Sequence, residues 1–465
     1  MTSTNLISPI VSRIIAVVCL LVIVASPSFA TPPAHYVNNT HPAASDSNPG
    51  TEALPWRTIG KCAAVLVAGD ICQVQDSVYN ERVTVTKGDV AYLGTGAIVR
   101  GFTITAAHVT VEGFTISGTT NAPCVTLGGA NGAAIRKNRI DHCGVSVFAG
   151  GGAAAIAALF GKPSTDVLID DNAISFVSDY VNPFGSHWVI RNNTLGPSAP
   201  ASTFHIDGMQ NNGVVTDSLF EGNMSVDNVS SDNHLFLNQI AGSTGWIIRY
   251  NTTLRSKGGL DWRSAGGHHF YGNTFVGNRA AGNLNNFQIL LTGSLGNAAR
   301  NNIWVNASSF NPYSVGSTSN LDKDFDLWWS AQGSPLEAHA INKDPLFVNA
   351  TAGNFRLQPG SPAIDAGGPL TRVRSTDTGT GTALRVVDAR FFQPGWAGVL
   401  PDVIAVGTAG NTAKIVSIDY SSNTITLAAV ISRKPGASVW LKSKSDGVNV
   451  LNGLAPDIGA NEYAQ

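Results

Sequence analysis

The amino-acid sequence predicts an all-β protein: a right-handed parallel β-helix solenoid with an N-terminal cap and a small C-terminal antiparallel β module. First, a short phrase recurs through the middle of the chain, an apolar pair followed by two polar residues and an Asn. Second, short β-branched runs alternate there with clusters of Gly, Asn, Asp and Ser, which mark turns. Third, the apolar residues show no sustained helical spacing, which disfavours a helical solenoid.

The repeated Asn marks the length of one coil. Asn138 ends the phrase AIRKN and Asn172 ends LIDDN, and equivalent Asn residues follow at positions 193, 223, 251, 273 and 302. Strands that recur once per unit must stack in parallel on those of the next unit, about 4.8 Å away. An Asn in every coil can then hydrogen bond along the stack while it adopts a left-handed turn conformation.

The first 30 residues have the composition of a secretory signal peptide. Arg13 precedes an apolar run at 14–24, and small residues end the segment at Ala30. This run is short for a membrane span, so we expect cleavage after Ala30, with a membrane anchor as the alternative. The mature chain is therefore expected to be secreted or periplasmic, without a membrane partner.

Four Cys residues remain after the signal peptide, in a compartment that permits disulfides. Four Cys allow three connectivities. We favour Cys62–Cys72 and Cys124–Cys143, because both pairs are local in the chain.

The chain divides into segments of different pattern. Short alternating runs such as 423–427 suggest antiparallel strands near the C-terminus, and a solenoid needs a cap over its open end. We predict a signal peptide at 1–30, a cap at 31–75 with a short helix near 56–67, the β-helix at 76–367 and the β module at 368–465.

Charge excludes some partners. The net charge is −2, only 13% of residues are charged, and no basic run is present, so nucleic acid is not an expected partner. We expect a monomer.

Segments at both ends of the solenoid resemble those of the pectin-lyase-like superfamily. They are DSNPGT at 46–51, DPLF at 344–347, GSPAIDAG at 360–367 and PDIGANEY at 456–463. The resemblance implies a secreted parallel β-helix protein that acts on a polysaccharide, expected to be acidic. It covers most of the chain and does not specify one reaction.

A set of polar residues between 179 and 271 exceeds what the turns require. Its centre is FHIDGMQ at 204–210. Ionisable residues on one long face suit a carbohydrate groove, and an aromatic ring can pack against a sugar. The predicted catalytic residues are His205, Asp207, His234 and Arg263. The predicted substrate-binding residues are Gln210, Asn238, Gln239, Lys257, Asp261 and Trp262.

The sequence favours β-elimination on a uronic-acid polymer and ranks hydrolysis below it. His205 or His234 would remove the proton next to the carboxylate, and Arg263 would neutralise that carboxylate. The segment LDWRS at 260–264 is similar to the Arg-bearing coil of the alginate lyase and chondroitinase B class. That class carries a catalytic Lys one coil earlier, whereas Lys257 lies in a nearby turn here.

Two alternatives accompany this lyase hypothesis. A glycoside hydrolase would use Asp207 with Asp232 or Asp261 as acid and base. A non-catalytic protein of the cell surface or matrix would only bind carbohydrate with the same face. No cofactor is certain, but Ca²⁺ could be held by Asp207, Asp232 and Asp261, because hard cations prefer oxygen ligands.

Overall fold

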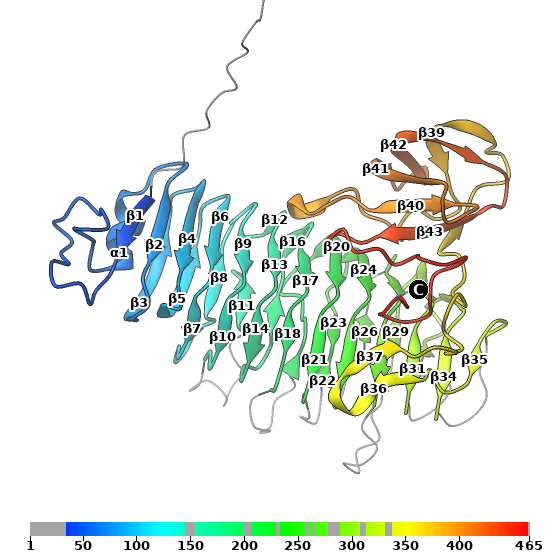
Figure 1. Cartoon of the computed structure of the whole chain (residues 1–465), viewed down its shortest axis with the longest axis horizontal. Coiled ribbons are helices and arrows are strands. Elements are labelled where there is room, and N and C mark those ends of the chain that lie inside the picture. Colours follow the sequence, from blue (N-terminus) through cyan, green and yellow to red (C-terminus); the bar gives the residue numbers. More distant parts are fainter. Residues whose placement is uncertain are drawn as a thin grey trace, which may run out of the picture. The chain divides into compact units, whose positions relative to one another are not determined.

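The computed structural model describes residues 34–144, 154–198, 206–228, 233–256, 260–263, 266–277, 289–306, 313–330 and 337–463. The predicted signal peptide lies outside these residues. Nearly all described elements from β1 to β35 are short strands that pair in parallel with strands one coil away (Figure 1). The predicted parallel β-helix is therefore confirmed.

One long sheet forms the first side of each coil. In the described residues it contains 14 strands, paired in parallel in the order of the coils. Its strands are β1 (Ala34–Val37), β2 (Ile71–Val74), β4 (Val90–Gly94), β6 (Val109–Glu112), β9 (Ala134–Arg136), β12 (Ser164–Thr165), β13 (Leu168–Asp170), β16 (Gly185–Ser186), β17 (Val189–Arg191), β20 (Val215–Glu221), β24 (Thr244–Arg249), β27 (His269–Tyr271), β30 (Asn297–Arg300) and β33 (Leu321–Asp324).

The second side follows the repeated Asn. Its strands are β3 (Val78–Val85), β5 (Ile98–Ile104), β7 (Thr115–Ser117), β10 (Arg139–Asp141), β14 (Ala173–Ser175), β18 (Thr194–Leu195), β21 (Met224–Val226), β25 (Thr252–Leu254), β28 (Thr274–Val276), β31 (Ile303–Val305), β34 (Leu327–Trp329) and β35 (Ile341–Asn342). The long strand β5 pairs with β7 and also with β8, so a branch of the same sheet begins the third side.

The third side completes each coil. Its strands are β8 (Val125–Leu127), β11 (Ile156–Ala158), β15 (Val181–Asn182), β19 (Ile206–Asp207), β22 (Asn233–His234), β23 (Phe236–Asn238), β26 (Leu260–Arg263), β29 (Ile289–Thr292) and β32 (Tyr313–Val315). An isolated bridge between Val181 and Met209 links the β15 branch to the coil of β19. The third side is the part of the fold that carries the candidate site.

The repeated Asn residues form a buried ladder at the corner between the first and second sides. Asn193 donates both its backbone N–H (3.0 Å) and its amide group (2.9 Å) to Oδ1 of Asn223. Asn223 makes the same two bonds to Asn251, at 2.9 and 3.1 Å. The pattern runs from Asn138 to Asn302 and ends on the carboxylate of Asp326. We call this series the Asn ladder.

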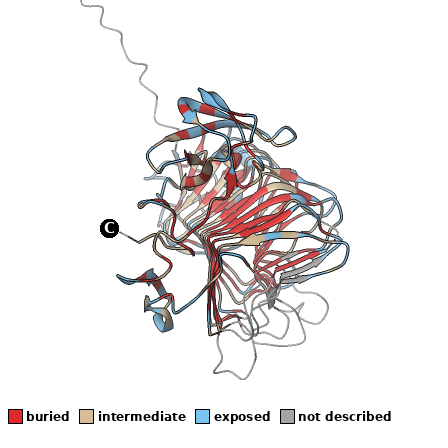
Figure 2. Ribbon diagram, turned by 90° about the vertical axis from the view of Figure 1, so that its right-hand side faces the viewer, coloured by how far each residue is buried: buried red, intermediate tan, exposed pale blue. Residues whose placement is uncertain are grey.

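Apolar side chains stack inside the coils in the same register. Ile135, Ile169, Ile190 and Phe220 are paired in successive strands of the first side, and all are fully buried. Burying each such side chain contributes about 1.5–3 kcal/mol. Figure 2 shows the buried strand residues continuing from coil to coil.

The helix α1 (Ile59–Val65) lies within the range predicted for a helix. Thr58 caps it by accepting the backbone N–H of Lys61. The Glu81 carboxylate accepts the free N–H groups of Ile59 and Gly60 at 3.1 and 2.8 Å. The strand β1 already joins the first sheet, so coil pairing begins inside the segment expected to be cap.

Both predicted disulfides are confirmed. Cys62–Cys72 joins α1 to β2, and Cys124–Cys143 closes a local loop. The described residues include no helix with the length and hydrophobicity needed to cross a membrane.

Past β35 the chain leaves the coils. A hairpin of β36 (Phe347–Asn349) and β37 (Asn354–Leu357) encloses the short helix η2 (Ala350–Ala352). An antiparallel sheet in the order β38-β43-β40-β41-β42-β39 then forms the predicted C-terminal module, with strands between residues 371 and 443 (Figure 1). Its elements are β38 (Thr371–Arg372), β39 (Gly379–Arg385), η3 (Trp396–Gly398), β40 (Val403–Val406), β41 (Thr412–Asp419), β42 (Thr424–Arg433) and β43 (Ser438–Ser443).

Outward-facing residues of the first side pack against the C-terminal module. Val189, Leu219, Ile247 and Ala298 belong to one apolar cluster with residues of the module such as Phe391. These side chains point away from the coil interior, so the module covers the outer face of this sheet over the strands β17 to β30.

A buried charge cluster joins the same two parts. Arg249 bonds Glu221 at 2.6 Å within the first side and both carboxylate oxygens of Asp402 in the module at 2.7 Å. The three charged side chains are fully buried. Tyr271 also donates to the backbone oxygen of Phe391 in the module.

The Asn ladder can be tested by removing one member. Asn223→Ala leaves the backbone oxygen of Ile190 and two N–H groups of Asn193 without their partner. We expect unfolding to require about 3–5 kcal/mol less free energy. Chemical denaturation measures this, and Asn342→Ala, which removes an exposed amide, should change it by less than about 0.5 kcal/mol. Equal effects of the two variants would contradict a structural role for the ladder.

The Arg249 cluster predicts a contrast between two arginines. Arg249→Met leaves two buried carboxylates unpaired and should cost about 3–5 kcal/mol. Arg255→Met removes a bidentate pair with Asp227 whose side chains are 41% and 43% exposed, and should cost at most about 1 kcal/mol. Denaturation together with limited proteolysis of the module measures both. A similar cost for both variants would show that the buried cluster does not fix the module.

The C-terminal tail predicts a pH effect. Burial, aided by the nearby charge of Asp457, raises the pKa of Glu462 from 4.5 to about 7. A raised folded-state pKa stabilises the fold below pH 4.5, and this stabilisation is lost as the pH rises through 7. Glu462→Gln should therefore destabilise the protein by about 2 kcal/mol more at pH 5 than at pH 8. The control Glu52→Gln changes an exposed residue and should have the same effect on stability at both pH values. Melting curves at pH 5 and pH 8 measure both variants. If Glu462→Gln also has the same effect at the two pH values, the proposed link between the pKa of Glu462 and stability is wrong.

Candidate functional site

Three ionisable residues occupy one position in successive coils at the start of the third side. The register of β19 and β22 pairs Asp207 with His234. A parallel bridge pairs Val181 with Met209. Asp179 and Asp207 each lie two residues before these positions, so they are opposite one another in neighbouring coils. Backbone positions in neighbouring coils are about 4.8 Å apart. We call Asp179, Asp207 and His234 the ionisable column.

Hydrogen bonds orient the carboxylate of Asp179. Its Oδ1 accepts the backbone N–H of Asp207 at 3.2 Å, and its Oδ2 accepts the amide of Asn182 at 3.2 Å. The same amide donates to the backbone oxygen of Gln210 at 3.0 Å. Asp207 is fully buried and Asp179 is 8% exposed, so the carboxylates differ in access to solvent.

A second buried polar network supports the corner behind the column. The Tyr180 hydroxyl donates to Oδ1 of Asn228 at 2.5 Å, and burial raises the pKa of Tyr180. Asn228 also donates its amide to Ser225, and Ser256 accepts its backbone N–H. These bonds hold the chain before β15 against the next two coils, which positions Asp179.

Two residues predicted to bind substrate lie in the core. Trp262 belongs to the hydrophobic core cluster inside the coils and packs against His268, with ring centroids 5.0 Å apart, so its ring faces the coil interior. The Asn238 amide is fully buried and lies 3.2 Å from Nε2 of His268. Both residues therefore pack the coil interior, contrary to the prediction from sequence.

The position of the proton on the His268 ring determines which atom of the Asn238 amide can bond to it. Nδ1 of His268 accepts the backbone N–H of Trp246 at 3.2 Å, so the ring proton is on Nε2. Nε2 then donates, and Asn238, whose Nδ2 is the atom placed 3.2 Å away, accepts this bond through its oxygen when its amide is turned over. Burial lowers the pKa of His268 to about 3, so the ring is neutral.

Arg263 and Asp261 form a pair of their own. Arg263 donates to both oxygens of Asp261, at 3.1 and 2.6 Å, and this hydrogen bonding raises the pKa of Arg263. Asp261 is paired with Leu237, three residues beyond His234, and Arg263 lies two residues further along. The register thus separates Arg263 from the ionisable column, although both were predicted to form one site.

The remaining predicted residues divide into two groups. Gln210 is half-buried next to Asn182, and Gln239 is exposed, with its backbone N–H donated to Oδ1 of Asn211. His205, Asp232 and Lys257 lie outside the described residues, and only the backbone of His234 is described. Within the described residues, no group of three or more His, Cys, Asp or Glu side chains could hold a metal ion.

The predicted calcium ligands do not converge in the described part. Asp261 lies two coils beyond Asp207 and three residues further along its strand. With coils about 4.8 Å apart and residues about 3.3 Å apart, the two backbone positions are roughly 14 Å apart. A single Ca²⁺ binds its oxygens at about 2.3–2.6 Å, so the pair cannot share one ion.

Asp179 is the column member that the sequence prediction missed. Counted back from the Asn of its coil, Asp179 stands 14 residues before Asn193, Asp207 16 before Asn223, and His234 17 before Asn251. The turns between the third and first sides differ in length, so the offset drifts. Counting directly from coil to coil gives 28 residues between Asp179 and Asp207, which is the signal that could have found it.

No family model and no curated protein matches the chain. Among solved structures, the chain is similar to XylC in complex with xylose, with a TM-score of 0.45 and 11% identity over 88% of this chain and 100% of that one. It is also similar to the pectate lyase Pel9A, with a TM-score of 0.46 and 12% identity over 76% and 94%. A third is a mannuronic acid-specific polysaccharide family 6 lyase from human gut microbiota, with a TM-score of 0.38 and 14% identity over 61% and 75%. These similarities concern the fold.

Proposed function

We propose that this protein is a secreted enzyme that cleaves a polysaccharide by acid–base catalysis at the ionisable column. The observation that carries the proposal is the register that places Asp179, Asp207 and His234 at one position in three successive coils. The fold does not require ionisable side chains in the column, because the Asn ladder already joins the coils at another corner.

Hydrolysis is the chemistry that the two carboxylates favour. The coil spacing of about 4.8 Å is close to the 5–5.5 Å that separates the carboxyl groups of retaining glycosidases. Asp179, oriented by two N–H donors, would attack the anomeric carbon while Asp207 donates a proton to the departing glycosidic oxygen. Water, deprotonated by Asp207, would then displace the sugar from Asp179, which restores both groups.

β-Elimination is the second candidate, and the pairing of His234 with Asp207 is the observation in its favour. His234 would abstract the proton next to a uronate carboxylate, and the bond to the leaving oxygen would break as a double bond forms. The carboxylate needs a cation beside it. Arg263, the cation expected from sequence, is instead paired with Asp261 and displaced along the strand, so we rank elimination below hydrolysis.

The predicted setting agrees with this proposal. Two disulfides suit a protein of an oxidising compartment, and the sequence begins with the composition of a signal peptide. The substrate would be an extended polymer, because the third side offers a long surface of parallel strands.

A substrate panel tests the reaction. Alginate, pectate, xylan and hyaluronan are incubated with the protein, and both reducing ends and ultraviolet absorbance are followed. Hydrolysis produces reducing ends without absorbance, whereas elimination also produces an unsaturated, absorbing uronide. Asp207→Asn and Asp179→Asn should each lower the rate by about 100-fold or more, because each removes one partner of the acid–base pair.

The matched control is Asp171→Asn, which changes an exposed turn carboxylate with a left-handed backbone that Asn also accepts. It should leave the rate unchanged. Full activity of both column variants would place the reaction elsewhere. Binding of a polymer without any cleavage would support the non-catalytic alternative.

A further inference from the structure

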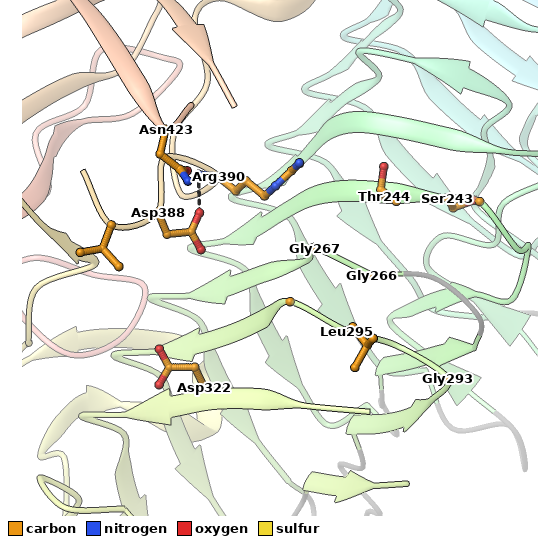
Figure 3. Close-up of a pocket in the computed structure, with 13 residues that line it drawn as sticks. Ser243, Thr244, Gly266, Gly267, Gly293, Leu295, Asp322, Asp388, Arg390 and Asn423 are labelled. Atoms are coloured by element: carbon orange, nitrogen blue, oxygen red, sulfur yellow. Dashed lines mark hydrogen bonds between the residues drawn. The ribbon is translucent and has the colours of Figure 1, made fainter. Parts of the chain in front are cut away.

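A pocket of about 750 Å³ lies between the coils and the C-terminal module (Figure 3). One wall is formed by turns that end the third side in successive coils, including Ser243, Gly267 and Leu295. The opposite wall comes from the module and includes Asp388 and Arg390. The volume is within the range of small-ligand sites, roughly 300–1,000 Å³.

Glycines give the coil wall a surface of backbone rather than side chains. Gly242, Gly267 and Gly296 have φ values of 88°, 68° and 73°, which disfavour residues with a side chain. At Gly267 an added Cβ would lie 3.7 Å from Cδ of Arg390, so the arginine passes directly over this turn. The turns require glycine because of these φ values. Since glycine has no side chain, the turns leave open space beside them.

Arg390 lines this space and forms a long ion pair with Asp217. Its guanidinium lies 5.5 Å from the centroid of the Tyr420 ring and 3.9 Å from Oδ1 of Asp217. Among the described residues, no acceptor is within hydrogen-bond distance of the guanidinium, and the side chain is 36% exposed. An arginine held over a ring, with only a long ion pair to Asp217, is suited to bind a planar carboxylate through two parallel bonds.

Asp388 forms a fixed acceptor beside Arg390. Its Oδ2 lies 2.7 Å from Nε2 of the fully buried His269, and its Oδ1 accepts the backbone N–H of Arg390 at 2.9 Å. Burial alone would raise the pKa of Asp388, but hydrogen bonding and the charges of His269 and Arg390 lower it. The ionised carboxylate can accept the hydroxyl protons of a sugar.

The outer part of the pocket is apolar. Leu295 and Val387 line it and are each 60% exposed. A sugar ring presents C–H groups on one face and hydroxyls at its edge, so it could meet these side chains and Asp388 together. A simple inorganic anion would use only Arg390.

We infer that this pocket is a second carbohydrate site, which binds a uronic acid residue with its carboxylate on Arg390 and its hydroxyls on Asp388. The site is distinct from the ionisable column. None of the residues that line the pocket belongs to the ionisable column. The inference does not depend on the proposed cleavage reaction, because no residue is shared between the two.

Binding of uronides to the full-length protein tests the inference. The protein carries the Asp207→Asn substitution, so that the sugars are not cleaved during the measurement. Calorimetric titration compares trigalacturonate and triglucuronate with the corresponding neutral galactose and glucose trisaccharides. We expect the uronides to bind at least about 10-fold more tightly, and Arg390→Gln to remove this difference. Arg385→Gln, an exposed arginine of the same module, should leave the affinities unchanged.

Charge at the pocket rim provides a second test that does not disturb the contacts of Arg390. Val387→Glu should weaken uronide binding and Val387→Lys should strengthen it, while neutral trisaccharides respond to neither. Equal affinity for charged and neutral sugars, or unchanged binding in Arg390→Gln, would overturn the inference. If Asp207→Asn retains full cleavage activity, only the proposed reaction at the column fails, and the pocket result stands on its own.

Discussion

The Asn ladder is the interaction on which the rest of this structure depends. A corner that turns sharply in every coil leaves backbone N–H and C=O groups buried, and each needs a partner. The Asn side chain meets this need twice, because its oxygen accepts two N–H groups from one neighbouring coil while its amide reaches a strand oxygen, as Asn223 does with Ile190. The series begins at the backbone N–H of Phe114 and ends on Asp326, so the register of every coil between them is fixed.

Charged residues at the ends of the first-side strands, just before the ladder Asn in each coil, also help to set the register of the sheet. In neighbouring strands of the first side, Arg136, Asp170, Arg191, Glu221 and Arg249 are paired in register with alternating charge. Opposite charges across strands favour this register, and a slip by one residue would move them to the other face. Most of this series is at least partly exposed, but the last pair is buried, because Asp402 of the module covers Arg249. The solenoid's own charge series therefore determines where the module attaches.

The sequence predicted the parallel coils, the two disulfides and the antiparallel module because each depends on local patterns. Local patterns did not predict whether a residue of the third side points into the core or outward. Trp262 and Asp261 are neighbours in sequence, yet one packs the core and the other pairs outward with Arg263, and a shift of one residue exchanges their roles. The offset between the Asn and the third side also varies with turn length, so counting back from the Asn does not align Asp179 with Asp207. Contacts such as Arg249 with Asp402 span 153 residues and have no local signal at all.

His268 and His269 show how one solenoid can supply both a packed core and a binding surface. Strand alternation directs His268 inward to Trp262 and Asn238, where burial keeps it neutral. His269 takes the outward position that Val189, Leu219 and Ile247 hold in earlier coils, and there it meets Asp388. This polar residue, which follows three apolar residues in the row, thus fixes the acidic wall of the pocket. The pocket and the ionisable column arise in the same way, since each is a place where a stacked position changes from packing residue to ionisable residue while the ladder keeps the register unchanged.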